Sequence, residues 1–201
     1  MTVEVREEPM AALAEYARVP IAFEVREVLD VAVRDGGMGG FVLSARPAAV
    51  PWTKDYDALG DGPAQWAARF DLSRWGLLAA RTEGRLVGGA VVAFDTAGVE
   101  MLEGRRDLAV LWDIRVAPEA RGQGVGAALF RAAEGWAAAR GCRRLKVETQ
   151  NVNVPACRFY ARQGCELGAI HRFAYPDLPD EVQLLWYRDL PPADVRSQPV
   201  R

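Results

Sequence analysis

The sequence predicts one domain of the α/β class, an α+β arrangement with a mixed sheet. Three observations predict this class. The first hundred residues hold mainly strand-like runs, the middle of the chain alternates strand, glycine-rich turn, helix, strand and helix, and two strand-like runs end it. This order is typical of a mixed sheet with helices packed on it. We expect the domain to cover residues 1–190, and residues 191–201 to form a flexible tail.

The first quarter of the chain gives the least definite pattern. Residues 1–20 show little hydrophobic periodicity, and residues 21–34 are compatible with either a strand or a helix. The glycine-rich run at 35–40 then breaks the chain before a strand that begins at Phe41.

The second quarter predicts a hairpin. Trp66 and Phe70 are spaced four residues apart, which predicts a short helix over residues 64–70. Two apolar runs then flank Glu83 and Gly84, a pair of residues that is typical of a tight turn between antiparallel strands.

The second half predicts two helices, each preceded by a strand. The strands are VLWDIRV and RRLKVETQ, and the helices cover residues 124–140, ended by Gly141, and the run from Pro155 to Gly164. A last antiparallel pair of strands surrounds residues 176–180. The first helix carries an apolar stripe that should pack on the sheet: Leu129, Phe130, Ala133, Trp136 and Ala137.

Composition and charge argue against several classes of partner. The 201-residue chain has a formal net charge of −2 and no basic block, which argues against nucleic acid. The acidic N-terminus does not resemble a signal peptide, and no apolar run approaches the roughly 18 residues of a membrane span. Cys142, Cys157 and Cys165 form no CxxC pair, so we expect reduced thiols, no metal site and a cytoplasmic protein.

A glycine-rich turn lies between the VLWDIRV strand and the following helix. It places Gly122, Gly124 and Gly126 where the helix begins, and glycine lets a ligand approach the backbone closely. A helix N-terminus has free N–H groups and partial positive charge, to which Arg121 adds a full charge. These features predict a phosphate or pyrophosphate site, and a tight connection without a ligand is the alternative.

Two other phosphate-binding patterns fit this turn less well. A Walker A loop is excluded because no Gly-Lys-Ser/Thr sequence follows. Gly122, Gly124 and Ala127 fit the dinucleotide pattern G-x-G-x-x-A, and Glu148 lies about twenty residues further on. However, the turn starts several residues after the strand, and VLWDIRV has a charged face where a strand of a dinucleotide fold should be apolar.

The turn resembles a signature of the GNAT superfamily of acetyltransferases, Arg/Gln-x-x-Gly-x-Gly/Ala. A second signature, N-x-x-A-x-x-F-Y-x-x-x-G-F, is similar to NVPACRFYARQGC, which departs from it at Cys165. The two signatures occur in the family's order and at its separation. DIRV, ETQNxNxPAxxFY and LLWY further resemble streptothricin-type antibiotic acetyltransferases. The matching positions are Arg121, Gly124, Gly126, Asn153, Ala156, Phe159, Tyr160 and Gly164.

The resemblance implies a GNAT-like fold in which VLWDIRV and RRLKVETQ are parallel neighbours that splay apart at their carboxyl ends. It implies acetyl-CoA as cosubstrate, with pantetheine paired to Ile114 and Val116 and the pyrophosphate on residues 121–126. The cofactor-binding residues that follow from it are Ile114, Arg115, Val116, Arg121, Gly122, Gln123, Gly124, Val125, Gly126, Asn153 and Tyr160.

Acetyl transfer to an amine needs a base for the amine and an acid for the departing thiolate. The resemblance implies Tyr160 as the acid, since a tyrosine with a pKa of about 10 stays protonated at neutral pH. Asp113 and Glu148 are the candidate bases, because both lie near strand ends that should face the acceptor, and Asp113 is slightly favoured of the two. Either carboxylate could instead belong to a surface ion pair. Asn153 is expected to cap the next helix, to contact the coenzyme, or both.

The acceptor site is expected in the run VPWTKDYDALGDG. Trp52, Asp55 and Tyr56, with Asp57 and Asp61, combine carboxylates and aromatic rings, which suits a cationic amine. A solvated acidic loop is the alternative.

The predicted reaction is direct acetylation of a primary amine on a small cationic molecule, such as a streptothricin-like antibiotic. A protein N-acetyltransferase and a non-catalytic acyl-CoA-binding regulatory module are the alternatives. The apolar run EVQLLWYRDL, taken as an edge strand, further predicts a homodimer.

Overall fold

The structure is a computed structural model that describes residues 3–60 and 62–191. The predicted tail over residues 191–201 therefore lies outside the described residues, apart from Pro191. The chain divides into two compact units, each considered by itself below, and the expectation of a single domain stays a prediction. Unit 1 spans Met1–Pro20, Asp61–Lys146 and Arg188–Arg201, and unit 2 spans Ile21–Gly60 and Val147–Tyr187.

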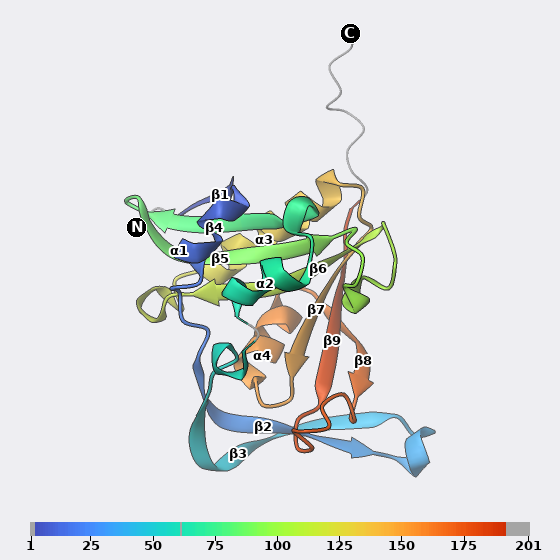
Figure 1. The fold of residues 1–201 in the computed structure, drawn as a ribbon. Helices are drawn as coiled ribbons and strands as arrows, with labels where there is room; N and C mark the ends of the chain where they lie inside the picture. Colours follow the sequence, from blue (N-terminus) through green and yellow to red (C-terminus); the bar gives the residue numbers. More distant parts are fainter. Residues whose placement is uncertain (1–2, 61, 192–201) are drawn as a thin grey trace. The chain divides into compact units, whose positions relative to one another are not determined.

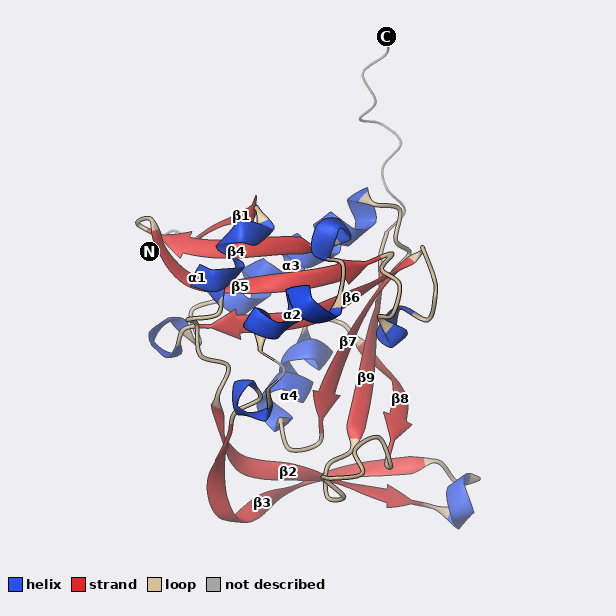
Figure 2. Cartoon of the chain, viewed as in Figure 1, coloured by secondary structure: helices blue, strands red, loops and turns tan. Residues whose placement is uncertain are grey.

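The secondary structure confirms a mixed α/β fold (Figure 2). The seven-stranded sheet has the order β1-β4-β5-β6-β7-β9-β8 and is mostly antiparallel, with β6 and β7 as the predicted parallel neighbours. A second sheet consists of β2 and β3. The strands are β1 (Glu4–Glu8), β2 (Phe23–Val33), β3 (Phe41–Lys54), β4 (Gly76–Thr82), β5 (Arg85–Phe94), β6 (Leu108–Val116), β7 (Arg144–Gln150), β8 (Glu166–His171) and β9 (Gln183–Asp189). The helices are α1 (Leu13–Tyr16), α2 (Pro63–Arg69), α3 (Val125–Ala139) and α4 (Val154–Arg162).

The predicted hairpin is present as β4 and β5. Its turn residues Glu83 and Gly84 have φ angles of 50° and 80°. Two consecutive positive φ angles are typical of the two-residue turns that join antiparallel strands. The short helix predicted around Trp66 is α2, so both predictions for this quarter of the chain are confirmed.

Helix α3 packs on β4, β5 and β6, as Figure 1 shows. All five residues of the predicted stripe are buried. The N–H groups of Gly141 and Cys142 return to the carbonyls of Ala138 and Ala137, so Gly141 ends the helix as predicted.

Two glycines of unit 1 provide a matched test of this packing. A Cβ added at Gly76 would lie 2.3 Å from the ring of Trp136, whereas one added at Gly135 would meet nothing within 4 Å. Gly76→Ala should therefore lower the free energy of unfolding by about 1–3 kcal/mol through overpacking. Gly135→Ala should raise it by about 0.5–1 kcal/mol, because alanine favours a helix interior. Urea denaturation measures both, and changes of the same sign would contradict this packing.

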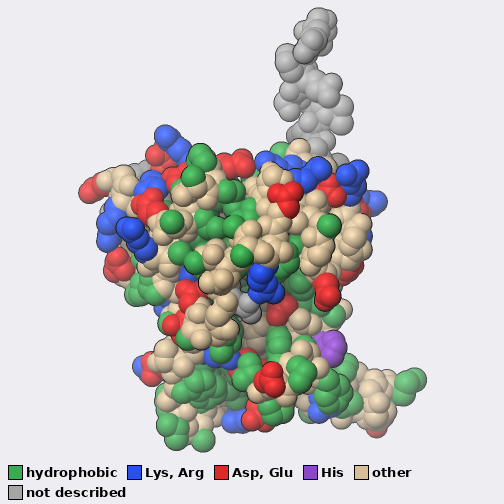
Figure 3. Space-filling model, viewed as in Figure 1, with side chains coloured by type: hydrophobic (Ala, Val, Ile, Leu, Met, Phe, Trp, Pro, Cys, Tyr) green, Lys and Arg blue, Asp and Glu red, His purple; other side chains and the backbone are tan. Residues whose placement is uncertain are grey.

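The ambiguous run at 21–34 forms strand β2. Val25 and Val28 are buried with Val152, and the pairing of β2 with β3 is interrupted between Val25 and Glu27. This interruption explains why the run lacks a regular period of two in its hydrophobic residues. Large apolar side chains remain exposed in unit 2 (Figure 3): Met38, Phe41, Val50, Trp52, Leu59 and Phe173.

Strand β9 is not an edge strand, so the basis given for the homodimer is wrong. It lies between β7 and β8 in the sheet, and Leu184 and Trp186 are buried there. Its apolar sequence is explained by burial within the sheet. The homodimer itself stays a prediction.

Cys142, Cys157 and Cys165 are buried, and no disulfide joins any of them in the part of the chain that the structure describes. Burial raises the pKa of Cys142 to about 11 and also raises that of Cys157, which makes both poor nucleophiles. The single histidine, His171, is exposed (Figure 3) and accepts a hydrogen bond from the Phe173 N–H. Within the described ranges, no three His, Cys, Asp or Glu residues gather as a metal site, and no helix is long and apolar enough to cross a membrane.

Candidate active site

The glycine-rich turn leaves a helix N-terminus without a cap. Gly122 and Gly124 have φ angles of 76° and 83°, and α3 begins at Val125 with no side chain capping it. The first helical hydrogen bond runs from Ala128 N–H to the Gly124 carbonyl, at 3.0 Å. In the described part of the chain, the N–H groups of residues 125–127 meet no acceptor. This arrangement suits an anion, because these donors lie at the positive end of the helix dipole.

The space beside the turn is open. A Cβ added at Gly122 or Gly124 would meet no protein atom within 4 Å. Arg121 is anchored beside the turn, since its Nε donates to the Val116 carbonyl at 3.0 Å and its Nη2 to the Pro20 carbonyl at 3.4 Å. The turn therefore fits the diphosphate of a coenzyme on grounds of charge, donors and space.

Strand β6 carries an irregularity next to Asp113. Asp113 lies opposite Val91 of β5 and Leu111 lies opposite Val92, which leaves Trp112 as an extra residue. Such bulges re-aim the side chains that follow them. Beyond the bulge, Ile114 and Val116 are paired with Ala90 and Gly88 of β5.

Asp113 belongs to a buried ion pair. Arg115 Nε and Nη2 donate to its two oxygens at 2.8 and 2.9 Å, and both side chains are almost completely buried. The Tyr16 hydroxyl also donates to Asp113. Burial, reinforced by the Asp113 charge, raises the pKa of Tyr16 well above its ordinary value. Gly89 makes room for this tyrosine, since an added Cβ would lie 2.7 Å from its ring. The negative charge of Asp113 is thus compensated within unit 1.

Glu148 is held differently, by neutral donors. Its Oε1 accepts from the Tyr175 hydroxyl at 2.5 Å and from Gln150 Nε2 at 3.0 Å, and its Oε2 accepts from Gln183 Nε2 at 2.7 Å. Throughout residues 3–60 and 62–191, no lysine or arginine forms an ion pair with it. Its neighbour along the strand face, Lys146, pairs with Glu103 instead. Glu148 therefore presents an uncompensated negative charge in unit 2.

Tyr56 belongs to the same group of residues. Its hydroxyl donates to Gln150 Oε1 at 2.5 Å, and Gln150 Nε2 also donates to the Tyr175 oxygen at 2.7 Å. Burial, followed by the charges of Glu181 and Glu148, raises the pKa of Tyr56. Burial and the Glu148 charge likewise raise the pKa of Tyr175. Both phenols consequently remain protonated donors at neutral pH. The structure also links Tyr56, which was predicted to bind the acceptor, through Gln150 to Glu148, which was predicted as a base.

The other predicted acceptor residues do not reach Glu148 through the hydrogen bonds of the structure. Trp52 lies on β3 with 41% of its surface exposed. The Asp55 carboxylate accepts the N–H of Asp57 at 3.0 Å, which is a local turn contact. Asp61 lies outside the described residues.

Helix α4 carries the residues of the second signature. The Asn153 side chain accepts the Ala156 N–H at 3.2 Å, so it caps the helix, which is one of its two predicted roles. Tyr160 is buried, with its ring 5.1 Å from that of Phe159. The coenzyme contact of Asn153 and the acid role of Tyr160 stay predictions.

Sequence reasoning missed four residues of these clusters as site residues: Tyr16, Gln150, Tyr175 and Gln183. Tyr16 is separated from Asp113 by 97 residues, and its segment has little pattern. Tyr175 precedes Pro176 in the loop between β8 and β9, and an aromatic residue directly before a proline turn was the available signal.

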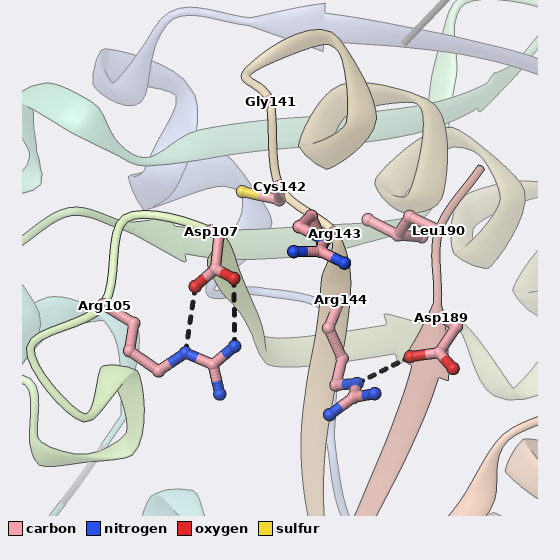
Figure 4. A pocket seen from close by; sticks show the side chains of 8 residues that line it. All are labelled: Arg105, Asp107, Gly141, Cys142, Arg143, Arg144, Asp189 and Leu190. Atoms are coloured by element: carbon pink, nitrogen blue, oxygen red, sulfur yellow. Dashed lines mark hydrogen bonds and ion pairs between the residues drawn. The ribbon is translucent and has the colours of Figure 1, made fainter. Parts of the chain in front are cut away.

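A pocket of about 680 Å³ lies elsewhere in unit 1 (Figure 4). Two ion pairs, Arg105 with Asp107 and Arg144 with Asp189, lie among its lining residues. None of the predicted site residues lines this pocket, and we assign it no part in the reaction. Its lining residues are Arg105, Asp107, Gly141, Cys142, Arg143, Arg144, Asp189 and Leu190.

Comparison with protein families identifies the fold. The family described as Acetyltransferase (GNAT) family matches residues 42–165. The chain belongs to the GNAT family of acetyltransferases. It is therefore an N-acetyltransferase, and acetyl-CoA is its cosubstrate, as the two signatures implied.

The related proteins refine the comparison. The chain is 34% identical to a streptothricin acetyltransferase from Escherichia coli over 169 residues, which covers 82% of this chain and 84% of that protein. It is 30% identical to a streptothricin acetyltransferase from Streptomyces lavendulae, covering 76% and 77%. The crystal structure of a nourseothricin acetyltransferase superposes with a TM-score of 0.73 and 26% identity, covering 95% of this chain and all of that one. The suggested resemblance to streptothricin-type enzymes is thus confirmed.

Proposed function

We propose that this acetyltransferase moves the acetyl group of acetyl-CoA to a primary amine on a small cationic molecule of the streptothricin type. Its similarity to streptothricin acetyltransferases over most of its length supports this substrate class. Acetyl-CoA supplies the activated acetyl thioester, and the chain must bind it, take up the amine proton and protonate the departing thiolate.

One observation carries the proposal, namely that Glu148 is ionisable, held in place and uncompensated. A carboxylate without a cationic partner attracts an ammonium group and can then accept its proton. Asp113 is less suited to this task, because Arg115 occupies both of its oxygens and a paired carboxylate is a weaker base. We therefore assign the base to Glu148, acting on the amine directly or through one water.

The remaining steps are assigned to the two signatures. The N–H groups of residues 125–127 and the Arg121 charge would hold the pyrophosphate, while Ile114 and Val116 would pair with the pantetheine arm. Tyr160 would donate its phenolic proton to the departing thiolate. The amine attacks the acetyl carbonyl directly, without an acyl-enzyme, since Cys157 is a buried thiol with a raised pKa.

Gly124→Val tests where the coenzyme lies. The new side chain would enter the open space beside the turn, so the Kd of acetyl-CoA should rise at least about tenfold, a loss of about 1.4 kcal/mol. Gly98→Val is the matched control, because Gly98 has a similar positive φ of 78° and an equally open Cβ position. Calorimetric titration measures both. Equal affinity of the two variants for acetyl-CoA would show that the pyrophosphate does not bind at this turn.

A thiol-release assay tests the function itself. Acetyl-CoA is supplied with streptothricin, aminoglycosides, polyamines or short peptides, and rapid release with streptothricin is expected. Turnover with peptides alone would favour a protein N-acetyltransferase. Tight acetyl-CoA binding without turnover on any amine would favour the non-catalytic module.

A further inference from the structure

The hydrogen bonds around Glu148 all run in one direction. The Tyr56 hydroxyl donates to Gln150, whose amide donates to Tyr175 and to Glu148, and the Tyr175 hydroxyl donates to Glu148. Gln183 donates from the other side. Each phenol has one proton and the Gln150 amide has two, so these donors are fully used. Glu148 thus accepts from each of these neighbours, as an ionised carboxylate does.

A count of acceptor positions shows what remains for a ligand. An ionised carboxylate offers about four lone-pair positions on its two oxygens. Two on Oε1 are taken by Tyr175 and Gln150, and one on Oε2 is taken by Gln183. One position, on Oε2, is left.

We propose that Tyr175 is a positioning residue, which together with Gln150 and Gln183 orients Glu148 so that this one Oε2 position meets the acceptor amine or its bridging water. The inference rests on the proposed function and adds residues outside both family signatures. A single open position restricts the base to one direction of approach, which favours a near-attack arrangement of the amine.

The loop that carries Tyr175 is itself anchored. Asn151 donates its backbone N–H to the Val182 carbonyl at 3.0 Å, and its side-chain oxygen accepts the Val182 N–H at 2.8 Å. Its amide also donates to the carbonyls of Leu29 and Asp180. These contacts fix the end of the loop between β8 and β9 that leads into β9, the strand that carries Gln183.

The charged groups of the neighbouring segments that the structure describes do not compensate the charge of Glu148. Glu181, from the same loop, forms an ion pair with Lys54 at the end of β3, and both side chains are about nine-tenths buried. Tyr56 and Tyr175 are the other titratable groups that face Glu148, and both stay protonated.

Tyr175→Phe is the principal test. The loss of a hydrogen bond to a charged group should lower kcat about 10-fold or more. The KM of the acceptor amine should change much less than kcat, because the variant loses the orientation of Glu148 and keeps its charge. The acetyl-CoA affinity measured by calorimetry should not change. Tyr56→Phe, one bond further away, should have a smaller effect of the same kind, and Tyr187→Phe is a control from β9.

Two further measurements separate positioning from a general structural role. In Glu148→Gln protein, adding Tyr175→Phe should cause no further loss of kcat, because the two residues act as one unit. The phenolic proton that Tyr175 donates to Glu148 should also give a proton resonance in the resting enzyme that is lost in either single variant. A change in the amine KM as large as that in kcat, additive losses or the absence of this resonance would overturn the inference. Wild-type enzyme that shows the resonance but acetylates no amine would overturn the proposed function and leave the network intact.

Discussion

Replacing Glu148 by glutamine is expected to lower kcat for streptothricin acetylation by about 10²–10⁴-fold, the usual contribution of a general base. Glutamine keeps the size of the side chain but cannot take up the amine proton. The affinity for acetyl-CoA should be unchanged, since the pyrophosphate is assigned to the glycine-rich turn. Steady-state kinetics with calorimetric titration of acetyl-CoA measures both quantities.

The control for this variant is Glu166→Gln, which removes an exposed carboxylate at the start of β8. It should retain the kcat of the wild type. A Glu148→Gln enzyme that also retained it would exclude Glu148 as the base. Asp113 would then return as the candidate, although its pairing with Arg115 means that its replacement leaves a buried cation and should destabilise the fold.

Replacing Tyr160 by phenylalanine should also lower kcat by about 10²–10⁴-fold, because the coenzyme A thiolate would leave without a proton. The ring would remain packed beside Phe159, so the fold should be retained. The affinity for acetyl-CoA should change little. A wild-type rate in this variant would exclude Tyr160 as the general acid.

The leaving group gives a sharper test of the same residue. A thiol that is more acidic than that of coenzyme A departs readily without a proton. An acetyl donor carrying such a thiol should therefore restore much of the rate lost in Tyr160→Phe, while having little effect on Glu148→Gln. Equal rescue of both variants would contradict the separate acid and base roles.

Much of the fold follows from local patterns in the sequence. The apolar stripe of α3 predicted its buried face, Gly141 its end, and Glu83 with Gly84 the turn of the hairpin. The two signatures of the family also lie in short continuous runs, so the family could be recognised without coordinates. Patterns of this kind are readable because each reflects a constraint within one element or one turn.

The interrupted pairing of β2 and the burial of β9 could not be predicted from local sequence, because both depend on contacts with distant segments. Val25 and Val28 of β2 are buried with Val152, which is distant in sequence. The apolar run of β9 could not be distinguished from an exposed edge, because the order of strands in a sheet is a tertiary property.

The sequence by itself determined the family, the class of reaction and the short list of two carboxylates. The tertiary structure decided the environments of those two carboxylates. Arg115 is two residues from Asp113, but Tyr16 is 97 residues away, while Tyr175 and Gln183 reach Glu148 across 27 and 35 residues. The physical reason is that the charge available on a carboxylate depends on which donors and cations surround it. Those neighbours come from separate segments, and their meeting leaves no local pattern in the chain.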